Sequence, residues 1–177
     1  AMVSVICNNG LNRSVREHKI TDPGKILDMT RDIVVEEFEK SGDDVKDGMD
    51  IALCSMNSKE LKYAGAYNPL WLVRNGEVFE TVADKQPISR FRFQKPFTTH
   101  HINLQKGDVI YIFTDGYLDQ FGGEHDKKYK TSKFKRFLLS IQDKDMDKQR
   151  TMLNEEFNRW KADFEQIDDV CIMGVRV

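Results

Sequence analysis

The spacing of apolar residues changes its period along the chain, and this order of periods is the strongest constraint on the fold. Residues 2–41 carry apolar side chains at helical spacing in two segments. Residues 49–113 change to the two-residue period of strands. Helical spacing returns over about 131–161, before a last apolar strand at 170–177. Because helical and strand segments are segregated, the sequence predicts an α+β fold with antiparallel sheets rather than a parallel βαβ sheet.

Local signals place several element ends. Asp22 is suited to cap the second helix, and Pro23 stands in its first turn, where a missing N–H costs nothing. The pair Asn75-Gly76 lies between two apolar runs and predicts a tight hairpin. The middle of the chain is therefore expected to be built from hairpins.

The composition restricts the function classes. The chain has 177 residues, 40% of them apolar and 32% charged, with a formal net charge of −2. These values are typical of one globular domain and give no sign of a nucleic-acid or membrane-surface binder. The three cysteines are scattered among mostly apolar residues, which predicts buried, reduced thiols in a cytoplasmic domain. A longer protein that contains this domain could still be anchored in a membrane.

Carboxylates mark the ends of two apolar strands. Asp115 follows the strand predicted at 109–113 and precedes Gly116, while Asp168-Asp169 opens the last strand. Either cluster taken alone is equally well explained as ordinary turn chemistry. If the two strands are neighbours in a sheet, however, the carboxylates converge, and such oxygen ligands suit hard cations such as magnesium or manganese.

Five short segments follow one another across most of the chain. They are Asp47-Gly-Met-Asp-Ile-Ala-Leu53, Tyr63-Ala-Gly-Ala-Tyr-Asn-Pro69, the run from Lys106 to Gly116 that ends in Thr-Asp-Gly, Asp119-Gln-Phe-Gly-Gly123 and Ile167-Asp-Asp-Val170. In these segments and in their order, the chain resembles the SpoIIE-like branch of the metal-dependent type 2C serine/threonine protein phosphatases.

The resemblance implies a specific chemistry. The family's fold is an α–β–β–α sandwich, and its aspartates bind two divalent cations, Mn²⁺ or Mg²⁺, for hydrolysis of phosphoserine or phosphothreonine. It assigns metal binding to Asp115 and Asp168, with Asp169 as a further candidate. The implied substrate is a phosphorylated regulatory protein in a signalling pathway, and the implied context is a bacterial protein with upstream sensory or repeat domains. Family members often dimerise, so a homodimer is an open alternative.

The sequence also departs from the family's pattern. The first metal motif, an aspartate-bearing strand pair followed by an Asp-x-x-Gly-His-Gly turn, is not found in residues 1–177. We therefore expect the chain to be the C-terminal portion of one catalytic domain whose N-terminal strands are missing. Such a fragment should bind metal weakly or not at all and show little phosphatase activity.

The sequence leaves further alternatives open. The alternative function is a non-catalytic module that uses the phosphatase fold to bind a phosphoprotein. A basic cluster over residues 127–136 fits either the docking of an acidic partner or a solvated face. The pair His100-His101 has no obvious carboxylate partner, which disfavours a metal site there.

Overall fold

The computed structural model describes residues 2–41, 48–90 and 93–177, and the chain forms two compact units. Unit 1 comprises Ala1–Leu70 and Thr81–Leu104, and unit 2 comprises Trp71–Glu80 and Gln105–Val177. Asp47, which opens the first of the segments resembling the phosphatase family, lies outside the described residues.

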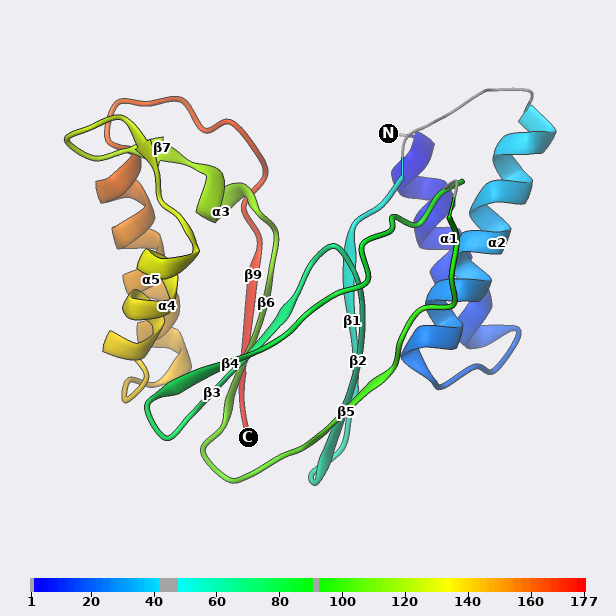
Figure 1. Ribbon diagram of the computed structural model, residues 1–177, viewed down its shortest axis with the longest axis horizontal. Coiled ribbons are helices and arrows are strands. Elements are labelled where there is room, and N and C mark those ends of the chain that lie inside the picture. The colour runs from blue at the N-terminus through cyan, green and yellow to red at the C-terminus, as the bar shows by residue number, and fades with distance from the viewer. Residues whose placement is uncertain (1, 42–47, 91–92) are drawn as a thin grey trace. The chain divides into compact units, whose positions relative to one another are not determined.

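The described residues of unit 1 form two helices and a three-stranded antiparallel sheet (Figure 1). The strand order is β1-β2-β5, and α1 and α2 pack against each other. The bounds are α1 Met2–Arg16, α2 Pro23–Ser41, β1 Ile51–Met56, β2 Glu60–Ala66 and β5 His100–Asn103.

Local chemistry explains how the helices of unit 1 begin and pack. Asp22 caps α2 by accepting a hydrogen bond at Oδ1 from the backbone N–H of Lys25, at 3.1 Å. A Cβ at Gly10 of α1 would lie 3.2 Å from Cγ2 of Thr30 on α2, so glycine allows the two helices to approach closely. The core of this unit is apolar, with Leu27 and Val34 of α2 fully buried against the sheet.

Unit 2 contains a four-stranded sheet in the order β4-β3-β6-β9, together with three helices and a small hairpin (Figure 1). The sheet strands are β3 Leu70–Arg74, β4 Glu77–Thr81, β6 Val109–Phe113 and β9 Ile172–Arg176. The helices are α3 Gly116–Asp119, α4 Thr131–Ser140 and α5 Met146–Lys161, and the hairpin is formed by β7 Phe121–Gly122 and β8 Lys127–Lys128.

Aromatic side chains dominate the core of unit 2. The ring of Trp71 lies edge-on to Phe113, with 4.7 Å between centroids, and Phe113 lies edge-on to Phe134 at 5.3 Å. Tyr117 extends this cluster to Phe157 of α5. The cluster joins β3, β6, α3, α4 and α5, so it fixes the end of β6 within the unit.

A buried ion pair connects β3 with the turn before β6. The guanidinium of Arg74 donates from Nε to Oδ1 of Asp108 at 2.7 Å and from Nη2 to Oδ2 at 2.6 Å. Asp108 is almost fully buried, and its Oδ2 also accepts from the backbone N–H of Gln105. The hydrogen bond from Arg74 is the main cause that holds the pKa of Asp108 below its usual value.

The predicted α+β fold with antiparallel sheets is confirmed. The second helix begins at Pro23 as expected, and the Asn75-Gly76 turn joins β3 to β4 with positive φ at both residues, 51° and 79°. The helix α3 and the hairpin β7–β8 were not predicted. The expectation of buried cysteines holds for Cys7, holds only in part for Cys54, which is half-buried, and is wrong for Cys171, which is exposed.

Candidate metal centre

The strands that carry the candidate carboxylates are neighbours. β6 and β9 pair antiparallel, with Phe113 opposite Ile172 and Val109 opposite Arg176. Asp115 follows the end of β6, and Asp168-Asp169 precedes the start of β9. In an antiparallel pair these two positions lie at the same end of the sheet, which meets the condition that the sequence left open.

Thr114 connects the two carboxylate segments. Its backbone N–H donates to the carbonyl of Cys171 at 3.0 Å, and its Oγ1 accepts from the backbone N–H of Cys171 at 2.9 Å. The same hydroxyl donates to the carbonyl of Asp169 at 2.9 Å. Thr114 thus donates two hydrogen bonds and accepts one, and together they extend the β6–β9 pairing as far as the backbone of Asp169. No local sequence signal marks Thr114 for this role.

Gly116 brings the two segments into direct contact. A Cβ at this position would lie 2.5 Å from the carbonyl oxygen of Asp169 and 3.3 Å from the carbonyl carbon of Asp168. Gly116 is the first residue of α3 and does not adopt a positive φ. Glycine is required here by the close approach of another backbone, not by a positive φ.

The carboxylates themselves are exposed at this end of the sheet. Asp115 occupies the N-cap position of α3, yet its side chain makes no capping hydrogen bond, which weakens its interpretation as ordinary turn chemistry. Asp168 accepts from the backbone N–H of Asp169 at Oδ1, at 2.7 Å. Within the described residues, Oδ2 of Asp168 and both oxygens of Asp115 have no protein donor.

These side chains are the type of ligand that a hard cation prefers, but they are too few to complete its coordination shell. Carboxylate oxygens are the ligands that Mg²⁺ and Mn²⁺ prefer. Among the described residues, however, no group of three or more His, Cys, Asp or Glu side chains is placed to hold an ion. Asp115 and the Asp168-Asp169 pair would therefore supply part of a coordination shell.

Several of the other sequence candidates are engaged with partners of their own. His101 in unit 1 does have a carboxylate partner, contrary to expectation, because Nδ1 lies 2.7 Å from Oε1 of Glu60 on the adjacent strand β2. The basic cluster of unit 2 divides: Lys133 lies over the ring of Trp160 at 3.5 Å, and Lys135 pairs with Glu80 at 2.7 Å.

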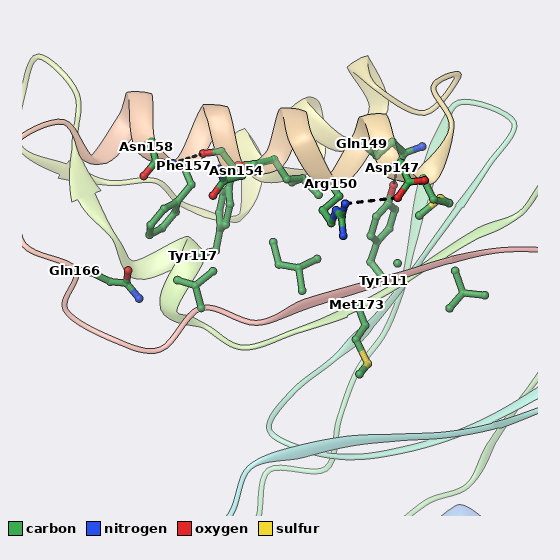
Figure 2. A pocket seen from close by; sticks show the side chains of 16 residues that line it. Tyr111, Tyr117, Asp147, Gln149, Arg150, Asn154, Phe157, Asn158, Gln166 and Met173 are labelled. Carbon is green, nitrogen blue, oxygen red and sulfur yellow. Dashed lines mark hydrogen bonds and ion pairs between the residues drawn. The ribbon is translucent and has the colours of Figure 1, made fainter.

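A cavity of about 730 Å³ lies between α5 and the strands β6 and β9 (Figure 2). Its polar groups bind each other: the hydroxyl of Tyr111 donates to Gln149, and Arg150 pairs with Asp147 at 3.7 Å. Burial raises the pKa of Tyr111 to about 12, so its phenol stays neutral. Asp115, Asp168 and Asp169 do not line this cavity, which is therefore separate from the candidate metal centre.

Several solved structures share this fold. The SiaA-PP2C domain of Pseudomonas aeruginosa matches with a TM-score of 0.87 and 22% identity over 100% of this chain and 70% of that one. The PP2C phosphatase domain of SpoIIE from Bacillus subtilis, solved with a fragment of its regulatory domain, matches with a TM-score of 0.75 and 17% identity, covering 99% of this chain and 50% of that one.

A serine/threonine phosphatase of Mycobacterium tuberculosis, PstP/Ppp, matches with a TM-score of 0.64 and 14% identity, over 96% of this chain and 80% of that one. These likenesses define the class of fold, that of the type 2C phosphatase domains. The family model of Stage II sporulation protein E (SpoIIE) matches residues 1–177, and the chain belongs to this family.

No curated protein matches the chain. Within the parts of the chain that the structure describes, no helix has the length and apolar character needed to cross a lipid bilayer.

Proposed function

We propose that this chain contributes to the metal-dependent hydrolysis of phosphoserine or phosphothreonine on a signalling protein. The observation that carries the proposal is the pairing of β6 with β9, which places Asp115 and Asp168-Asp169 at one end of one sheet. Membership of the SpoIIE family and the type 2C phosphatase fold support the same reaction class.

In this proposal Asp115 and Asp168 are metal ligands, and Asp169 is a further candidate. Two divalent cations, when bound, would lower the pKa of a water molecule and neutralise the phosphoryl oxygens. The protein's own residues contribute by positioning the segments that carry these carboxylates. Thr114 and Gly116 hold the backbones of the two carboxylate segments against each other, so these segments are fixed relative to one another.

We also propose that the chain is the C-terminal portion of a catalytic domain, and that an upstream segment completes the metal shell. The shortage of ligands among the described residues supports this proposal. The chain also spans only 70% and 50% of two of the structures that it matches. On this basis residues 1–177 alone should show little phosphatase activity.

The test compares the complete polypeptide with its Asp115→Asn and Asp168→Asn variants. We expect both variants to weaken Mn²⁺ binding in calorimetric titration and to slow the Mn²⁺-dependent hydrolysis of p-nitrophenyl phosphate. Asp163→Asn is the matched control, because Asp163 is an exposed carboxylate outside the candidate centre. Unchanged binding and rate in the Asp115 variant would refute the proposed role of this residue.

A second candidate is a non-catalytic module that binds a phosphoprotein. The shortage of ligands among the described residues fits this candidate as well as it fits part of an enzyme. The two candidates differ in the upstream sequence: an aspartate-bearing strand and a Gly-His-Gly turn there favour the enzyme, and their replacement favours the binding module.

A further inference from the structure

A cleft of about 470 Å³ opens beside Asp115 in unit 2. One side is formed by α3, with Leu118 and Asp119. The other side is formed by the segment from Lys128 to Ser132, which leads into α4. The cleft therefore shares a residue with the candidate metal centre and adds basic and hydroxyl groups next to it.

The wall that carries the basic residues is firmly held. The backbone N–H of Tyr129 donates to the carbonyl of Gln120 at 3.0 Å, and that of Lys130 donates to the carbonyl of Leu118 at 2.9 Å. The ring of Tyr129 is buried, and its hydroxyl donates to Glu156 on α5. These backbone hydrogen bonds and the buried ring fix the segment, so its lysines are held at defined positions beside α3.

The hairpin before this wall is anchored to α5. Nε1 of Trp160 donates to the carbonyl of Gln120 at 3.0 Å, and the backbone N–H of Gly123 donates to the carbonyl of Trp160 at 3.0 Å. A Cβ at Gly122 would lie 1.8 Å from that same carbonyl oxygen. Only glycine allows this approach, so the hairpin is a fixed part of unit 2.

The basic residues of this region serve different purposes. Lys133 and Lys135, as described above, are engaged with Trp160 and Glu80. Of the two lysines that line the cleft, Lys128 pairs with Asp119 at 2.7 Å. Lys130 is exposed and has no ion-pair partner among the described residues, which leaves its ammonium group available at the cleft.

Lys130 also has an unusual backbone. It stands at φ 70° and ψ 150°, a region that glycine occupies readily and other residues at a cost in free energy. Such conformations persist where the surroundings impose them, and they cluster at functional sites. The structure thus keeps a lysine where glycine would be the better backbone residue, which points to a role for the side chain.

We propose that Lys130 binds an anionic side chain of the phosphoprotein substrate beside the residue that is dephosphorylated. This inference rests on the proposed phosphatase function. The natural occupant is an aspartate or glutamate flanking the phosphorylated residue, because the cleft adjoins Asp115 and a free ammonium group attracts a carboxylate. The cleft would then select acidic sequences rather than take part in the chemical step.

The kinetic test uses the complete polypeptide with Mn²⁺ and two phosphoserine peptides, one flanked by glutamates and the other by glutamines. Lys130→Gly removes the ammonium group and suits the backbone, so the protein should remain folded. We expect this variant to reduce the preference for the acidic peptide, measured as the ratio of kcat/KM values, about three- to tenfold. Lys127→Ala, which removes a neighbouring exposed lysine outside the cleft, should keep the ratio.

A binding test separates this inference from the proposed function. Fluorescence anisotropy with the acidic peptide, in the presence of EDTA, measures recognition without turnover. Lys130→Gly should weaken binding by a similar factor, and added salt should reduce the difference from wild type. If Asp115→Asn leaves hydrolysis unchanged, the proposal that Asp115 binds metal fails. The anisotropy measurement still decides the role of Lys130, because it does not depend on turnover. Equal affinity of wild type and Lys130→Gly for the acidic peptide would overturn the inference. A peptide with a second phosphate in place of the glutamates shows which anion the cleft prefers.

Discussion

Gly116→Ala is the substitution that most directly tests how the candidate centre is built. The new methyl group would meet the carbonyl oxygen of Asp169 at 2.5 Å, whereas ordinary contacts begin at 3.4 Å. That carbonyl must retreat by roughly 0.9 Å. It belongs to the backbone and accepts a hydrogen bond from Thr114, so it has little freedom to move.

The structure sets the size of the effect. Overpacking of this kind costs about 1–3 kcal/mol. Loss of the Thr114 hydrogen bond adds about 0.5–1.5 kcal/mol. We therefore expect the free energy of unfolding to fall by about 2–4 kcal/mol. With a urea m-value of about 2 kcal/mol per molar, the unfolding midpoint of unit 2 should fall by about 1–2 M.

Tryptophan fluorescence in urea is a suitable assay because both tryptophans, Trp71 and Trp160, belong to unit 2. Gly174→Ala is the matched control in the same sheet. Its methyl group would meet mainly the flexible end of Met146, at 2.7 Å, so its midpoint should change by less than half as much. Equal shifts in the two variants would refute the argument that the Asp169 backbone requires glycine at position 116.

Three further predictions concern unit 2. Asp108→Asn should destabilise the protein at neutral pH by about 2–4 kcal/mol, because Arg74 loses its buried carboxylate partner. Since the folded-state pKa of Asp108 is lowered, its contribution is complete above the unfolded pKa of about 4 and is lost as the pH falls through the folded value. Chemical denaturation between pH 2 and 7 should therefore show a smaller acid loss in the variant, and an identical pH dependence would contradict this reasoning. Gly122→Ala should expose the ring of Trp160 by detaching the hairpin, seen as a red-shifted emission spectrum; an unchanged spectrum would mean that the hairpin tolerates a methyl group. Tyr111→Phe should cost about 1–3 kcal/mol in urea unfolding, since it leaves a buried amide oxygen without its donor, and a neutral result would show that water replaces the hydroxyl.

Short-range chemistry made several elements predictable from the sequence. The backbone N–H of Lys25 donates to Oδ1 of Asp22, at 3.1 Å, so α2 begins where its capping residue indicated. The pair Asn75-Gly76 predicted a hairpin because few residues accept the positive φ that this two-residue turn requires. By contrast, α3 has four residues and each strand of β7–β8 has two, which is too short for a hydrophobic period to emerge.

The candidate centre was predictable only in part. The carboxylates stood out because each follows or precedes an apolar strand. Their adjacency depends on which strands pair, and local patterns do not encode that choice. The hydrogen bond from Thr114 to Asp169 joins residues 55 positions apart, and the contact between His101 and Glu60 joins residues 41 apart. Such partners become visible only once the strand register is known.

The joint formed by Thr114 and Asp169 has a consequence for how this protein can change. The chain leaves the sheet after Thr114 and returns to it at Asp169, so α3, the hairpin, α4 and α5 form one excursion that starts and ends at the same place. Changes confined to the exposed surface of the excursion, away from its aromatic core, need not alter the geometry at its base. A designer could exchange the wall that carries Lys130 for that of another family member and redirect selectivity, while the paired strands keep the carboxylates in register.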